Sequence, residues 1–141
     1  MSRQIKLAAL AAAFLTTLSA YAAGTPSPPN AEAYIIWPPD GAVVTGGKLW
    51  VRMGLRNMGV CPKGVDSPNC GHHHLLLDAD LPAGGEPIPS DRNHLHFGAG
   101  ETEARIELPP GRHTLQMLLG DKDHVPHDPP VHSRKITITV R

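Results

Sequence analysis

The chain has 141 residues, of which 40% are hydrophobic and 18% are charged, and its formal net charge at pH 7 is zero. A single domain is the expectation at this length. Lys and Arg do not outnumber Asp and Glu, so the chain lacks the excess positive charge that a nucleic-acid-binding surface needs. The 14 glycines and 15 prolines disfavour long helices, because these two residues are the poorest helix formers. The nine histidines are the most unusual feature of the composition.

The first 22 residues have the pattern of a cleaved secretory signal peptide. Arg3 and Lys6 supply a positive start, residues 7–18 form an apolar stretch, and residues 20–22 (Ala-Tyr-Ala) match the small-x-small cleavage pattern. The apolar stretch is too short for a membrane helix, which needs about 20 residues. We therefore expect a signal peptide over 1–22, a mature chain that begins near Ala23, and no membrane span after cleavage. The expected location is periplasmic or secreted.

Export bears on the two cysteines of the chain, Cys61 and Cys70. In an oxidising compartment a lone pair of cysteines usually forms a disulfide. The alternative is a pair of thiolate metal ligands, but structural zinc sites usually separate paired cysteines by only about two to four residues. We therefore expect a Cys61–Cys70 disulfide that closes a loop rich in Pro and Gly.

Residues 23–30 are Pro-rich and polar, and we expect them to form a flexible linker. Residues 31–141 show period-two alternation of apolar residues in short segments that Pro and Gly turns separate. This pattern predicts strands over 33–37, 48–56, 73–78, 94–97, 102–108, 112–119 and 134–140. About seven short strands in a single domain predict an all-β fold, an immunoglobulin-like β-sandwich over 31–141.

Eight of the nine histidines fall at one end of this predicted sandwich, because consecutive antiparallel strands alternate in direction. His72 and His74 lie two residues apart on one strand and so share a face, and the same holds for His94 and His96. His113 alone is predicted at the opposite end, where we expect a structural role. The candidate metal ligands are His72, His74, His94, His96, His124 and His127.

Imidazole nitrogens bind transition metals at about 2.0–2.1 Å, and two His-x-His pairs on neighbouring strands would supply three or four of them. An all-imidazole set suits copper(II) or zinc, and the general order of affinities favours copper. Met58 is a further candidate, as a soft ligand for copper(I). The aspartates near the last His-rich loop are candidates to orient the rings by accepting their second N–H. These aspartates are Asp121, Asp123 and Asp128.

Four segments, taken in this order, resemble a known bacterial family. They are 71–76 (GHHHLL), 93–98 (NHLHFG), 108–116 (LPPGRHTLQ) and 119–131, which contains LGD and HVPHDPPV. Over about residues 71–140 the chain is similar to the family known as domain of unknown function 4399. The resemblance implies an exported bacterial protein and supplies no activity, because none is established for the family.

The sequence gives little indication of an enzyme, because it contains no nucleophile elbow, phosphate-binding loop or dinucleotide-binding motif. Whether it is an enzyme stays open, and a non-enzymatic role is favoured. We expect an exported protein that binds copper or zinc for metal handling, with the metal ion and a periplasmic protein as its partners. The alternative is a metal-independent binding or structural module that recognises a partner protein or a small anionic ligand.

Overall fold

The computed structural model describes residues 24–141, and the predicted signal peptide lies outside them. Among the described residues there is no helix that is long and apolar enough to cross a membrane. The elements of this part of the chain are β1 (Glu32–Trp37), β2 (Val43–Val44), β3 (Lys48–Arg56), β4 (Gly59–Val60), β5 (Cys70–Leu77), β6 (His94–His96), β7 (Glu103–Glu107), β8 (Gly111–Gly120) and β9 (Ile136–Val140).

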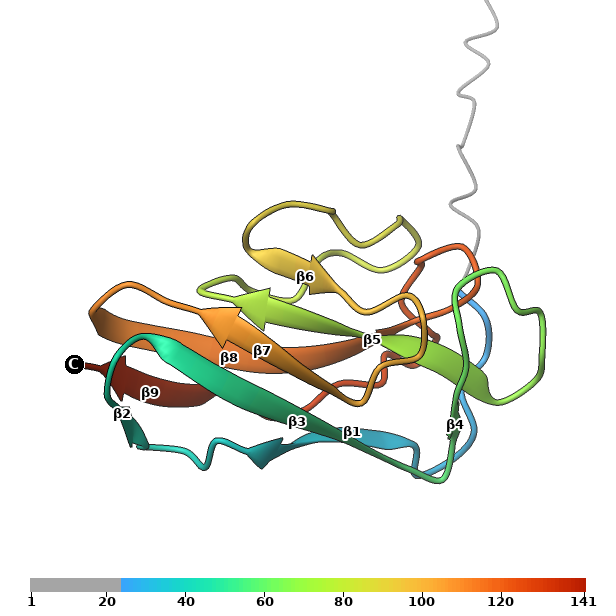
Figure 1. Cartoon of the computed structure of the whole chain (residues 1–141). Coiled ribbons are helices and arrows are strands. Elements are labelled where there is room, and N and C mark those ends of the chain that lie inside the picture. The colour runs from blue at the N-terminus through green and yellow to red at the C-terminus, as the bar shows by residue number, and fades with distance from the viewer. Residues whose placement is uncertain (1–23) are drawn as a thin grey trace, which may run out of the picture.

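The strands form two sheets that pack face to face, as Figure 1 shows. The smaller sheet has the order β1-β3-β7 and is antiparallel throughout. The larger sheet has the order β2-β9-β8-β5-β4, and β6 pairs with the same edge of β5 as β4 does. The predicted all-β, immunoglobulin-like sandwich is therefore confirmed.

The core lies between the two sheets and follows from the alternation in the sequence. Leu49, Val51 and Met53 of β3 point inward from the smaller sheet and are at most 5% exposed. Each such side chain contributes about 1.5–3 kcal/mol to stability when it is removed from water. The larger sheet meets them with Leu75, Leu115, Met117, Leu119, Ile136, Ile138 and Val140.

The seven predicted strands correspond to β1, β3 and β5–β9, with ends that differ by up to three residues. The structure adds β2 and β4, which the sequence did not predict. Each has two residues, and each pairs in parallel with a strand of the larger sheet, β9 and β5 respectively. Two residues are too few to show an alternating pattern, so only the fold reveals these strands.

Strand β5 is buried on both of its faces, and this places the histidines. Its residues His73, Leu75 and Leu77 pair with Leu119, Met117 and Leu115 of β8 and face the core between the sheets. The other face, which carries His72, His74 and Leu76, points away from the smaller sheet. The loops 78–93 and 121–130 cover it, and Ile88 packs there on Leu76 and Leu118. The two loops are joined where the Ile88 N–H donates to the His124 carbonyl at 2.8 Å.

The segment that composition predicts to be a flexible linker runs beside the loop after β8 in the structure. The hydroxyl of Thr25 donates to Oδ2 of Asp121 at 2.7 Å, and the N–H of Ser27 donates to the Asp128 carbonyl at 3.1 Å. Gly24 packs so closely that an added Cβ would lie 1.9 Å from the Pro126 oxygen. Residues 24–28 are thus part of the folded domain, because their polar groups bond to the His-rich loop.

Candidate metal centre

Four imidazole rings converge on the covered outer face of β5. His72 and His74 come from β5, His96 comes from β6, and His124 comes from the loop 121–130. The centroids of these rings lie 4.7–6.0 Å apart. The Nε2 atoms of His72 and His74 are 3.1 Å apart, and those of His96 and His124 are 3.2 Å apart. Nitrogens of His72, His74 and His96 all lie within 4.8 Å of one another, so these three residues could hold a metal ion.

Strand register and two glycines explain why the rings meet. His96 stands directly opposite His74 in the antiparallel β5–β6 pair, so their side chains share a face. At Gly98, an added Cβ would lie 2.2 Å from Cε1 of His96. At Gly120, it would lie 2.9 Å from Nε2 of His74. Both distances are too short for real atoms, so the two rings occupy space that only glycine leaves free.

A tight turn at residues 121–125 positions His124 beside the other three rings. Oδ1 of Asp121 accepts the N–H groups of Asp123 and Val125 at 2.9 and 3.0 Å. The His124 N–H donates to the Asp121 carbonyl at 2.9 Å, and His124 has a φ of 66°, in the left-handed region. The buried carboxylate of Asp121 therefore shapes the turn on which His124 stands.

Asp121, Asp123 and Asp128 were expected to orient imidazole rings, but none of the three carboxylates bonds to a ring among residues 24–141. The Asp121 carboxylate bonds to Thr25 and to the turn. The Asp123 carboxylate pairs with the Lys122 ammonium at 2.6 Å. Asp128 is held through its backbone, as its N–H donates to the Thr25 carbonyl at 3.0 Å. The Asp121 carboxylate accepts backbone N–H groups of the turn and not an imidazole N–H, because buried N–H groups need acceptors.

Burial and crowding favour the uncharged form of three clustered rings, those of His72, His74 and His96. Burial, with repulsion from His124 and His96, lowers the pKa of His72 to about 4. Burial, with repulsion from His72 and His96, lowers the pKa of His74 to about 3. Burial and the neighbouring His124 also lower the pKa of His96. A neutral imidazole carries a lone pair on one nitrogen, which is the form that binds a metal.

The cluster is open to solvent on one side through a pocket of about 330 Å³. His72 is 1% exposed and lies below this pocket, so it forms the inner side of the cluster. The pocket is lined by His74, His96, His124, Lys63, Pro87, Ile88 and Ser90. A small ion or molecule can therefore reach the ring nitrogens without any strand moving.

Two of the six predicted ligands lie outside this cluster. His94 stands opposite Leu76, and its Nδ1 lies 2.8 Å from Oδ1 of Asp91. His127 has its Nε2 3.3 Å from the Cys70 carbonyl, and its ring packs where a Cβ of Gly71 would be. The spacing of His94 and His96 puts both on one face of β6, but it does not give the register with β5, which sets His96 and not His94 opposite His74.

Two other histidines, and the candidate ligand Met58, lie apart from the cluster. His73 is fully buried and faces the core, and burial lowers its pKa to about 4. Met58 packs against the core between the sheets. His113 bonds to Asp78 and to the Pro109 carbonyl at the other end of β8.

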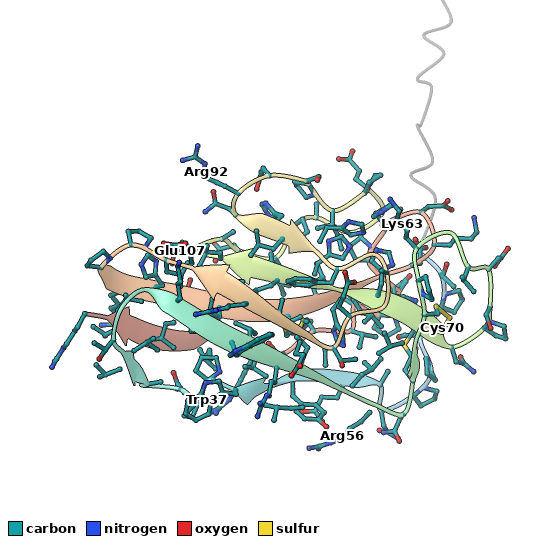
Figure 2. All side chains as sticks on the ribbon, in the orientation of Figure 1. Trp37, Arg56, Lys63, Cys70, Arg92 and Glu107 are labelled. Atoms are coloured by element: carbon teal, nitrogen blue, oxygen red, sulfur yellow. A yellow bond between two sulfur atoms is a disulfide. The ribbon has the colours of Figure 1, made fainter. Side chains whose placement is uncertain are left out.

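Cys61 and Cys70 form the predicted disulfide, seen near the Cys70 label in Figure 2. The bond ties the loop 61–69 to the first residue of β5, two positions before His72. The Cys61 N–H also donates to the Gly71 carbonyl at 2.9 Å. The disulfide thus fixes the start of the strand that supplies two of the four clustered rings.

Comparisons with known proteins address the family and leave the activity open. No curated protein matches the chain. A solved structure of fibronectin(III)-like modules from Clostridium thermocellum CbhA matches at 15% identity, with 77% of this chain and 92% of that chain covered and a TM-score of 0.37. The family resemblance drawn from the four motifs is confirmed. The chain belongs to the family described as Domain of unknown function (DUF4399), whose model matches residues 51–141.

Proposed function

We propose that the protein binds one transition-metal ion, copper or zinc, through His72, His74, His96 and His124. The observation that carries the proposal is the convergence of nitrogens from His72, His74 and His96 within 4.8 Å. In a tetrahedral site with metal–nitrogen bonds of 2.0–2.1 Å, ligand nitrogens stand about 3.3 Å apart. The Nε2–Nε2 distances of 3.1 and 3.2 Å in the two closest pairs are near that value.

The chemistry of the donors supports the same proposal. Neutral imidazoles suit copper(II) and zinc, and both cysteines are committed to the disulfide, so no thiolate competes. The Nε2 atoms of His72 and His74, and those of His96 and His124, face each other in two pairs, so one metal ion between the rings would coordinate nitrogens that otherwise contact only each other.

Recognition of an anion by the rings themselves is the weaker alternative. It needs protonated imidazoles, whereas burial lowers the pKa of His72 to about 4 and of His74 to about 3. We propose metal storage, delivery or scavenging as the role, in a periplasmic or secreted protein that exchanges metal with a periplasmic protein partner. The signal-peptide pattern of residues 1–22 supports this location.

A thermal melt of the purified exported protein tests the proposal at neutral pH. Metal-free protein is compared with protein to which zinc or copper(II) is added. A ligand that binds only the folded state adds about 2.7 kcal/mol of stability at a hundredfold excess over its Kd. The double variant His72→Ala and His74→Ala should lose this gain.

The control is His132→Ala, because His132 is exposed and its Nδ1 bonds only to the adjacent Ser133 carbonyl. This variant should keep the full metal-dependent stabilisation. A wild-type melt that is unchanged by both metals would contradict the proposal, and so would an equal loss in the control.

A further inference from the structure

Imidazole binds a metal as a neutral ligand, so the four clustered histidines would leave the charge of a bound ion uncompensated. A divalent ion on four neutral imidazoles keeps both of its positive charges, and a buried charge is costly unless an anion pairs with it. The two carboxylates that influence the cluster are Asp121, near His72, and Glu101, near His96. Asp121 is bonded to its turn, and Glu101 accepts the Ala99 N–H at 2.9 Å.

The pocket on the solvent side of the cluster is the place where an anion could enter. Three of the four rings line it, so a ligand in the pocket would approach the metal directly. Its volume of about 330 Å³ exceeds the space of one water molecule, about 30 Å³, many times over. Ile88 and Ser90 form its far wall on the loop 78–93, and Ser90 is exposed. A small anion therefore fits without rearrangement of the sheet.

Lys63 brings a positive charge to the same pocket. Its N–H donates to the Gly98 carbonyl at 2.9 Å, which holds the disulfide loop beside the strand end that carries His96. Its Cδ would lie 3.0 Å from a Cβ at Gly98, the glycine under the His96 ring. Lys63 takes part in none of the ion pairs found among residues 24–141. Figure 2 shows it on the side of the molecule that carries β6 and the loop after β8.

Building on the proposed function, we infer that the metal centre keeps a fifth coordination position, beyond the four imidazoles, open towards this pocket and binds a small anion there, with the Lys63 ammonium as the anion's second contact. The anion forms one coordinate bond to the metal through a nitrogen or oxygen lone pair, and no electron is transferred. In this arrangement the histidines hold the ion, and the residues that line the pocket, Lys63 among them, select the additional ligand.

Azide titrated into the copper(II)-loaded protein tests this inference. Copper loading is measured first, by the electron paramagnetic resonance spectrum of the bound ion. Azide bound to copper(II) then produces a new charge-transfer absorption band that saturates with azide concentration. If copper(II) does not bind, the proposed function and this inference both fail. If copper(II) binds and azide produces no band, or only strips the metal, the open position alone is wrong.

Lys63→Met and Lys122→Met form a matched pair for the second contact. Removing one solvated charge should weaken azide binding about two- to fivefold in Lys63→Met and leave copper binding intact. Lys122 is already paired with Asp123, so Lys122→Met should leave azide binding unchanged. Equal azide affinities in the two variants would contradict the role of Lys63.

Ser90→Phe tests the entry route separately. The exposed position of Ser90 allows a larger side chain without disturbing the core. The phenyl ring should fill the pocket and abolish the azide band while copper(II) still binds. An unchanged azide affinity would show that the anion does not enter by this pocket.

Discussion

Both ring nitrogens of His113 face oxygen acceptors. Nδ1 lies 2.7 Å from Oδ2 of Asp78, and Nε2 lies 2.9 Å from the Pro109 carbonyl. Since neither a carboxylate nor a carbonyl donates, both nitrogens carry hydrogens and the ring is a cation. The hydrogen bond to Asp78 raises the pKa of His113. At the cluster, burial lowers the pKa of His74 to about 3, so the same residue type is a cation at one end of β8 and a neutral ring near the other.

His113→Gln should therefore destabilise the protein in a pH-dependent way. Protonated His113 contributes its full stabilisation below the unfolded-state pKa of 6.5, and this contribution is lost as pH rises through the raised pKa of the folded state. The linked contribution of Asp78, whose pKa His113 lowers against the effect of burial, is lost below its usual 3.8. Because Asp78 is partly exposed, we expect a difference of about 1 kcal/mol at about pH 5 and less at about pH 9.

Urea unfolding of the wild type and His113→Gln at the two pH values measures this difference. His132→Gln serves as the control, since His132 has no carboxylate partner among residues 24–141. A difference that is the same at both pH values would mean that His113 is not a cation in the folded protein.

Gly98 leaves the space that the His96 ring occupies, so a substitution there should displace the ring. A methyl group there would lie 2.2 Å from Cε1 and 2.5 Å from Nε2 of His96, so Gly98→Ala should push this ring out of the cluster. Changes that misorient a metal ligand typically weaken affinity about 10- to 100-fold. Zinc affinity measured against a competing chelator should show this loss. Gly84→Ala is the matched control, because an added Cβ there meets nothing within 4 Å. Equal affinities in the two variants would contradict the position of His96.

The alternation of side chains along β5 predicts correctly that His72 and His74 share a face. It does not tell which face, because apolar residues occupy both, with Leu75 and Leu77 inward and Leu76 outward. The loops that cover the outer face of β5 decide which face is which, and the packing of loops produces no periodic pattern in the sequence. The register of β6 is likewise hidden: His96 rather than His94 stands opposite His74.

The disulfide loop is the element whose stability contribution is simplest to measure. Replacing Cys61 and Cys70 together by Ser frees a short loop in the unfolded chain, which should cost about 2–3 kcal/mol in the loop-entropy model. Denaturant unfolding of the double variant and of the oxidised wild type gives this value. Wild type unfolded with a reductant should show the same loss. A variant as stable as the oxidised protein would show that the bond adds nothing to stability.

The sandwich as a whole is predictable because several strands carry their own alternating pattern, most clearly β3 (Lys48–Arg56). The sequence predicts the clustered histidines at one end of the sandwich. Four of them lie on the outer face of the larger sheet, under the loops 78–93 and 121–130, and the sequence does not predict this cover. The N-terminal segment, through Thr25 and Asp121, helps to hold one of these loops. Such contacts join residues far apart in the chain and are not encoded in any local pattern.

We propose that His72, His74, His96 and His124 together hold one metal ion. Calorimetric titration of the metal-free exported protein with zinc, repeated with copper(II), measures this binding itself. We predict one ion bound per chain, a large loss of affinity in His96→Ala, and near wild-type affinity in His94→Ala, two residues away on the same strand. No saturable binding of either metal would contradict the claim, as would equal losses in the two variants.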